Sequence, residues 1–176
     1  IIAHDGFIEP QPPVKRAIAW VNEILSDDQY ADLIEIKAFT IPEAEDTWSS
    51  TKKMYWPDGG QLTRDEILAG GKPIHPLTDW IYHGERSAGM LTATDITLLR
   101  HTRDRCRDSF AKSWEKQDVD VVIGPAFVGP ACSHDSALYW TYTSLYNLLD
   151  YPAVVFPTPI KSEHGEAYNK TYRPLS

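Results

Sequence analysis

The stretch WTYTSLYNLLDYPAVVFP, residues 140–157, contains both kinds of element that decide the fold. Its last part, 153–156, is a short apolar run between two prolines, which is typical of a buried strand. The part before it has the apolar spacing of a helix, which we expect over about 136–149 with Asp135 or Ser136 as its cap. A helix followed at once by a strand favours an α/β layer.

Outward from this stretch, short strands and helices alternate along the chain. Further strands are expected at 1–3, 33–36 and 119–123. Further helices are expected at about 13–26, 43–56, 62–69 and 94–117. The sequence therefore predicts an α/β fold class in which a mixed β-sheet is flanked by helices.

The clearest of these helices is the one at 94–117, which Thr92 or Thr94 can cap. Its apolar residues recur at helical spacing: Ile96, Leu99, Cys106, Phe110 and Trp114. Between Lys72 and Gly89 we expect irregular chain, because this segment contains Pro73 and Pro76. The end of the chain, 158–176, is polar and predicts a loop.

Length and charge exclude several classes of protein. The chain has 176 residues, enough for a domain with a core, and a formal net charge of −8. An acidic chain without clustered lysines and arginines is not expected to bind nucleic acid. No apolar run is long enough to span a membrane. Two cysteines form no disulfide framework, which favours a reducing, cytoplasmic location.

Two local patterns contain the residue types of covalent hydrolysis. Ser133-His134-Asp135 resembles a triad in composition, but consecutive side chains diverge and seldom share one imidazole ring. Ser-x-x-Lys occurs twice, starting at Ser49 and at Ser50, without the companion motifs of the penicillin-interacting enzymes. The six histidines are scattered without the spacing of a zinc site, and there is no phosphate-binding loop. We therefore expect no catalytic residue, no metal site and no cofactor within these 176 residues.

The helix predicted at 136–149 has apolar character on two faces. One face carries Ala137, Trp140, Thr141, Ser144 and Leu148, and the other carries Tyr139, Tyr142, Tyr146 and Leu149. One face can pack on the core while the other lines a ligand cavity. The alternative is that both faces belong to the core.

Several segments together resemble the C-terminal part of the amidase signature hydrolases, and especially the fungal-type general amidases and acetamidases related to fatty acid amide hydrolase. They are DVDVVIGPA (118–126), YWTYTSLYNLLDYPAVVFP (139–157), DGFIEPQPPVKRAI (5–18), YWPDGG (55–60) and GGKPIHPLTDW (70–80). Lys72 departs from the family pattern, in which an acidic residue is expected. The resemblance implies a partial amidase-signature fold, with residues 1–176 as the C-terminal part of one amidase domain, cut at both ends.

The resemblance also implies a reaction, the hydrolysis of a carboxylic amide to an acid and ammonia or an amine. The family uses a Ser–cis-Ser–Lys triad on a Gly/Ser-rich loop with the lysine upstream, and this sequence has no such loop. The triad is therefore expected outside the chain. By the same alignment Ala137, Trp140 and Ser144 fall where the related lipid-amide hydrolase lines its acyl channel. The expected partners are a small amide, the remainder of the amidase domain and a second copy in a homodimer.

Two other interpretations stay open. The chain could be a noncatalytic binding module derived from an amidase, or an independent serine hydrolase that uses Ser133 or Ser50. A Gly/Ser-rich loop and a lysine encoded upstream would favour the amidase over both.

Overall fold

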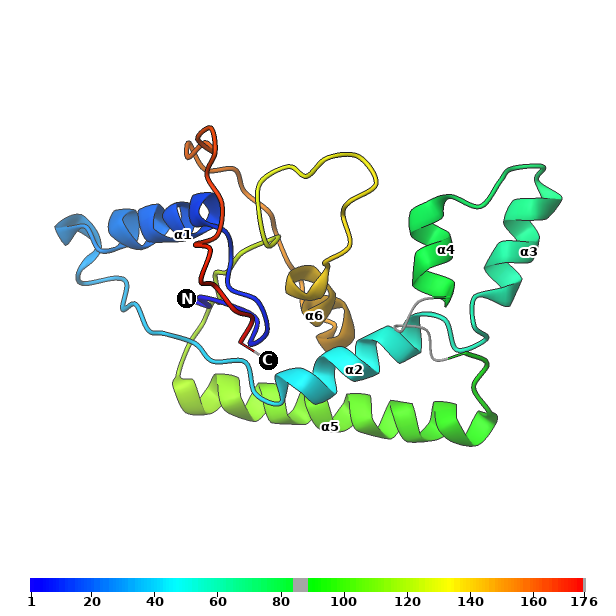
Figure 1. Ribbon diagram of the computed structural model, residues 1–176. Coiled ribbons are helices and arrows are strands. Elements are labelled where there is room, and N and C mark those ends of the chain that lie inside the picture. The colour runs from blue at the N-terminus through cyan, green and yellow to red at the C-terminus, as the bar shows by residue number, and fades with distance from the viewer. Residues whose placement is uncertain (84–88, 176) are drawn as a thin grey trace.

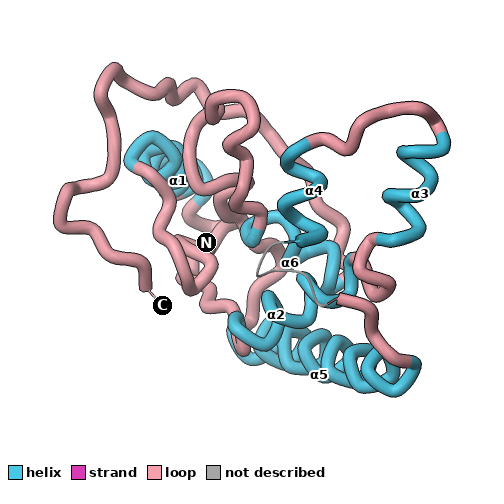
Figure 2. Tube along the Cα trace, turned by 45° about the vertical axis from the view of Figure 1, so that its right-hand side comes forward, coloured by secondary structure: helices cyan, strands magenta, loops and turns pink. Residues whose placement is uncertain are grey.

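The computed structural model describes residues 1–83 and 89–175, and their regular elements are helices (Figures 1 and 2). In chain order these are α1 (Pro12–Leu25), the short 3-10 helix η1 (Asp28–Tyr30), α2 (Ala44–Tyr55), α3 (Gln61–Ala69), α4 (Pro76–His83), α5 (Ala93–Gln117) and α6 (Thr141–Leu149). No helix in this part of the chain is long and apolar enough to cross a membrane.

Helices α2, α5 and α6 form the packed centre. In Figure 1, α5 runs along one side of the molecule, α2 lies on it, and α6 lies against α2. The predicted apolar side of α5 is confirmed at Cys106 and Phe110, which are buried. Thr92 caps α5 as expected, because its hydroxyl accepts from the amide of Asp95 while the Asp95 carboxylate accepts from the Thr92 amide. Around Phe110 gather the other core residues Ile2, Phe39, Leu145 and Leu149.

Helix α4 corrects the expectation of irregular chain between Lys72 and Gly89. Pro76 stands at the first helical position, where the N–H that proline lacks would have no partner within the helix, so it starts the helix instead of breaking it. Tyr82 then packs on Gly60 so closely that a Cβ atom built on Gly60 would lie 2.3 Å from its ring. Residues 84–88, which belong to the same expectation, lie outside the described residues.

The mixed β-sheet is the larger correction, because the described residues contain no strand and only one isolated bridge, between Asp58 and Met90. Segment 1–3 does lie in parallel register beside 37–39. The Ile1 nitrogen donates to the Lys37 carbonyl at 2.6 Å, and the Phe39 amide donates to the Ile1 carbonyl at 2.9 Å. On its other side, the Ile2 amide donates to the Ile123 carbonyl at 2.8 Å.

The hydrogen bonding between 1–3 and 121–124 does not continue, because proline has no N–H. The next bond of a parallel ladder between 1–3 and 121–124 needs the N–H of residue 125, and Pro125 has none. The expected strand at 153–156 makes no backbone hydrogen bond within the described residues, and Val154 is 89% exposed. The expected strand at 33–36 is not formed either, because the amides of Leu33 and Ile34 both donate to the Tyr30 carbonyl in a turn.

The polar segment at the end of the chain is a loop, as the sequence predicts, and it is tied to the chain before α1. The rings of Tyr168 and Tyr172 stack with centroids 4.4 Å apart. The Tyr168 hydroxyl donates to the Glu9 carbonyl at 2.5 Å, and the Tyr172 hydroxyl accepts from the Glu9 amide at 2.9 Å. Burial raises the pKa of Tyr168 to about 12, so this donor keeps its proton at neutral pH.

Candidate functional site

The three residues expected to line a pocket are placed differently from one another. Helix α6 begins at Thr141 and not near 136, so Ala137 lies on an irregular segment and is exposed. Trp140 is the N-cap residue of α6 and is half-buried. Ser144 lies one turn later, where its amide donates to the Trp140 carbonyl at 3.1 Å, and its side chain is buried. The structure thus brings Trp140 and Ser144 together and leaves Ala137 apart.

The later start of α6 follows from the turn before it. The hydroxyl of Ser136 donates to the Ser133 carbonyl at 2.8 Å, so it closes a turn and does not cap a helix. Asp135 has a φ of 62°, in the left-handed region, which interrupts any helix through that position. The helical face expected to include Ala137 is therefore broken before it reaches that residue.

Trp140 is held by aromatic neighbours from α2. Its ring meets the ring of Trp48 edge-on at 5.0 Å and the ring of Tyr55 edge-on at 4.9 Å. The Tyr55 hydroxyl in turn accepts from the Asn147 amide group on α6 at 2.8 Å. The indole Nε1 of Trp140 is buried and has no hydrogen-bond partner among the described residues. The indole is thus fixed in position while its one polar atom keeps its donor capacity.

The aromatic contacts continue from this cluster to α4. Tyr55 meets Trp56 at 5.2 Å, and Trp56 meets Tyr82 edge-on at 5.3 Å. Lys52 adds a cation above the Trp48 ring at 5.2 Å. The sequence argument overlooked these aromatic residues of α2, although the helix that carries them was predicted at 43–56. Their signal was the spacing of seven between Trp48 and Tyr55, which places both on one helical face.

The chain that leads into α6 is anchored by a buried carboxylate. Asp5 is 3% exposed, and its Oδ1 accepts from the amides of Phe7 at 3.0 Å and Ile8 at 3.1 Å. Its Oδ2 accepts from the Tyr139 hydroxyl at 2.5 Å. The Tyr142 hydroxyl donates to the Ile8 carbonyl at 2.5 Å, and burial raises the pKa of this phenol far above its usual range. Tyr142 therefore stays neutral and acts as a fixed donor.

The Ser133-His134-Asp135 pattern is not arranged as a triad. The Asp135 carboxylate lies 3.2 Å from Nε2 of His75 on the segment before α4, so it does not pair with His134. The Ser133 hydroxyl lies 3.1 Å from that of Ser136. Ser50 is buried in the contact between α2 and its neighbours. In residues 1–83 and 89–175, no group of three or more His, Cys, Asp or Glu side chains could hold a metal ion.

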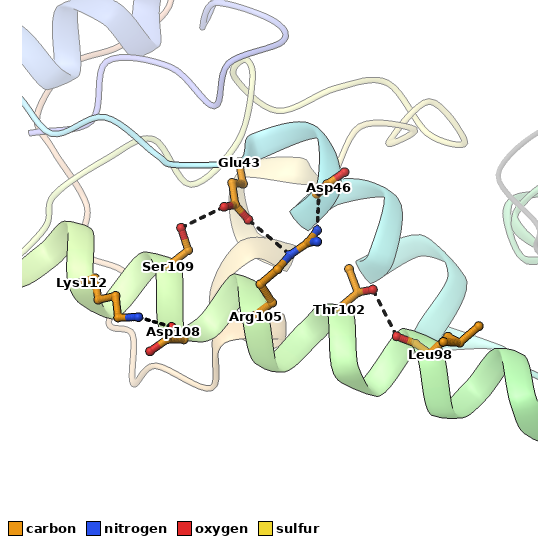
Figure 3. A network of polar contacts seen from close by, with 8 residues as sticks. All are labelled: Glu43, Asp46, Leu98, Thr102, Arg105, Asp108, Ser109 and Lys112. Carbon is orange, nitrogen blue, oxygen red and sulfur yellow. Dashed lines mark hydrogen bonds and ion pairs between the residues drawn. The ribbon is translucent and has the colours of Figure 1, made fainter.

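Ion pairs join α2, which carries Trp48 and Tyr55, to α5 (Figure 3). Nη2 of Arg105 on α5 lies 2.6 Å from Oδ2 of Asp46, and its Nε lies 3.9 Å from Glu43. The Ser109 hydroxyl donates to the same Glu43 carboxylate at 3.2 Å. Both carboxylates stand at the N-terminal end of α2, where the helix dipole favours negative charge.

Comparisons with known proteins agree with one another. The amidase family model matches residues 1–168. A Schizosaccharomyces pombe protein with a provisional amidase name is 35% identical over 176 residues, which is all of this chain and 32% of that protein. An acetamidase of Aspergillus oryzae is 24% identical over 98% of this chain and 32% of its own length.

A solved structure points the same way. A fatty acid amide hydrolase matches with a TM-score of 0.75 and 29% identity, over 85% of this chain and 26% of that one. The chain thus spans about a third of the length of the curated relatives it matches. Its fold matches part of that hydrolase, although the described residues contain no strand where a mixed sheet was expected. The chain therefore belongs to the amidase signature family.

Proposed function

We propose that this chain is part of an enzyme that hydrolyses a carboxylic amide, and that it supplies one wall of the substrate pocket. The observation that carries the proposal is the position of Trp140, fixed between Trp48 and Tyr55 at the start of α6. Ser144 follows it in the next turn, and Ala137, exposed on the preceding segment, is the proposed rim of the wall. A rigid aromatic surface of this kind suits a small ligand.

The catalytic groups are proposed to lie outside these residues. Family membership supports a Ser–cis-Ser–Lys mechanism, in which the lysine removes a proton from the nucleophilic serine through the bridging serine. That serine attacks the amide carbonyl, and backbone amides stabilise the oxyanion. The role of this chain is then to orient the acyl group and exclude water. The cytoplasmic location expected from its two cysteines stays a prediction.

The bulk of Trp140 favours a short acyl group. An indole that two neighbouring rings hold in place cannot easily swing aside to admit a long chain. The name of the Aspergillus oryzae relative, an acetamidase, agrees with a short acyl group. We therefore propose a small amide as substrate.

The proposed partner of the chain is the remainder of the amidase domain. Exposed apolar residues gather on the extended segments, where Val121 is 71% exposed and Val155 is 77% exposed. A groove of about 190 Å³ lies between these segments and α1. Strands from the rest of the domain would cover these residues and complete the sheet. A homodimer remains an alternative occupant of the same surface.

Replacement of Trp140 by alanine in the full-length enzyme tests the pocket wall. We expect kcat/KM for long-chain amides to rise relative to acetamide, because the wall recedes by an indole. Trp20→Ala on α1 is the matched control and should leave the ratio as it is. An unchanged ratio in Trp140→Ala would contradict the pocket wall.

Labelling with a serine-directed fluorophosphonate distinguishes the amidase fragment from an independent serine hydrolase. The 176-residue chain alone is expected to neither hydrolyse acetamide nor react with a fluorophosphonate. A label on Ser133 or Ser50 would favour the independent serine hydrolase. Ligand binding by a natural chain that has no catalytic portion would favour the noncatalytic binding module.

A further inference from the structure

A small cavity lies behind the pocket wall, between α2, α6 and the segment 2–7. It offers about 20 Å³ of room for the centre of a water molecule. A water molecule needs about 10–15 Å³ on this measure, together with two to four polar partners. Four serine and threonine side chains line the cavity: Thr47, Thr51, Thr141 and Ser144.

Thr141 is the residue that points to an occupant. Its side chain is 94% buried, since 6% of its surface is exposed, and its Oγ1 has no hydrogen-bond partner among the described residues. The backbone amides of Thr141 and Tyr142 also make no hydrogen bond in this part of the structure, because they belong to the first turn of α6. Buried polar groups in folded proteins are nearly always bonded to protein or to ordered water.

The neighbouring hydroxyls can only complement Thr141 through a bridging molecule. The Thr51 hydroxyl donates to the Thr47 carbonyl at 2.7 Å, and the Ser144 hydroxyl donates to the Thr141 carbonyl at 3.3 Å. Each has used its one hydrogen and keeps lone pairs that can accept. Thr141 Oγ1 can donate, and neither acceptor lies within hydrogen-bonding distance of it. A water molecule can accept from one side and donate to the other.

We propose that one ordered water molecule binds in this cavity and joins the Thr141 hydroxyl on α6 to hydroxyl oxygens such as that of Thr51 on α2. The water fixes the first turn of α6 against α2. Because Trp140 precedes that turn directly, the same water supports the orientation of the indole. This inference concerns the packing of the two helices and is independent of the proposed hydrolysis.

The substitutions Thr141→Val and Thr141→Ser distinguish a Thr141 hydroxyl that is bonded to water from one that has no partner. Valine keeps the shape and the β-branch but removes the hydroxyl, whereas serine keeps the hydroxyl. A bridging water predicts that Thr141→Val lowers Tm by about 3 °C and that Thr141→Ser retains most of the stability. An unbonded hydroxyl predicts the opposite sign, because its removal relieves an unpaired buried group.

Direct observation of the water completes the test. A crystal structure at about 1.5 Å resolution is expected to show density in the cavity of the wild-type protein and none at that position in Thr141→Val. A Tm of Thr141→Val equal to or above that of the wild type would overturn the proposal. A cavity without density in the wild type would also overturn it. If Thr141→Val does not fold, the wild-type density and the stability of Thr141→Ser decide the question.

Discussion

The helical centre and the extended segment 153–156 both carry large apolar residues, and these residues have opposite exposure. Phe110 on α5 is 1% exposed, whereas Val154 in the segment 153–156 is 89% exposed. The difference lies in where the backbone finds its hydrogen bonds. A helix satisfies its own N–H and C=O groups and needs a partner only for one face, whereas a strand needs neighbours along its edges. Helices α2, α5 and α6 find that partner among the described residues, and segment 153–156 does not.

The comparison indicates how this part of the amidase fold is divided. The proposed pocket wall has Trp140 and Ser144 at the start of α6, in the helical centre. The exposed residues of the segments 119–123 and 153–156 are instead the proposed contact surface with the remainder of the domain. Substitutions in the helical centre should therefore lower the free energy of unfolding much more than substitutions at exposed positions of the extended segments.

The largest difference is expected between Phe110→Ala and Val155→Ala. The Phe110 ring contacts the rings of Phe39, Trp114 and Tyr151 in the core. Its removal leaves a cavity and should lower the free energy of unfolding by about 3–5 kcal/mol. Val155 is exposed, and its truncation in this chain should change that free energy by less than about 0.5 kcal/mol. Urea unfolding of both variants measures the difference, and equal costs would contradict the comparison.

A second contrast uses two aspartates. Asp5→Ala removes the acceptor of two amides and of the Tyr139 hydroxyl, and should cost about 2–3 kcal/mol of unfolding free energy. Asp120→Ala, at an exposed position of the segment 119–123, should change the free energy of unfolding by almost nothing. Thermal unfolding of the two variants side by side tests this. A small effect of Asp5→Ala would mean that the segment before α6 is held by its tyrosines alone.

The sequence predicted the helices better than the sheet. The periodicity of α5 and its Thr92 cap are local properties, and both are confirmed. Strand pairing is a non-local property: 1–3 pairs with 37–39, which was not among the expected strands, and Pro125 cannot donate the next bond with 121–124. The sequence alone does not give the register in which two segments meet, so it could not show this effect of the proline.

The three residues proposed for the pocket wall differ in how well the sequence placed them. Trp140 is the N-cap residue of α6 and Ser144 lies one turn later, so the spacing of four expected for this pair is present. Ala137 was placed on the same helix because Asp135 and Ser136 are good capping residues, and the structure uses Ser136 to close a turn instead. Trp48 and Tyr55, which hold Trp140, come from another helix, and no local pattern identifies such a contact.

A smaller effect is expected from the ion pairs that join α2 to α5 (Figure 3). Arg105→Ala removes the contacts to Asp46 and Glu43, and should cost about 0.5–1 kcal/mol because all three side chains are exposed to solvent. Arg100→Ala on the same helix is the control and should be nearly neutral. The cost of Arg105→Ala should shrink in 1 M salt, which screens the pair. A cost that does not change with salt would indicate lost packing of the arginine stem instead.

The smallest effect concerns the acid side of the stability curve. The Thr92 hydroxyl and amide, which bond to the Asp95 carboxylate, hold the pKa of that carboxyl below its usual value. Because the folded state has the lower pKa, the stabilisation is complete above the unfolded pKa of about 4, and it is lost as the pH falls through the folded pKa. Thr92→Ala should therefore flatten the dependence of Tm on pH below about pH 4, whereas Thr92→Ser should keep it. If the dependence of Tm on pH is the same in Thr92→Ala as in the wild type, the first turn of α5 is frayed in the folded protein. The capping bonds would then not contribute to the stability of the helical centre.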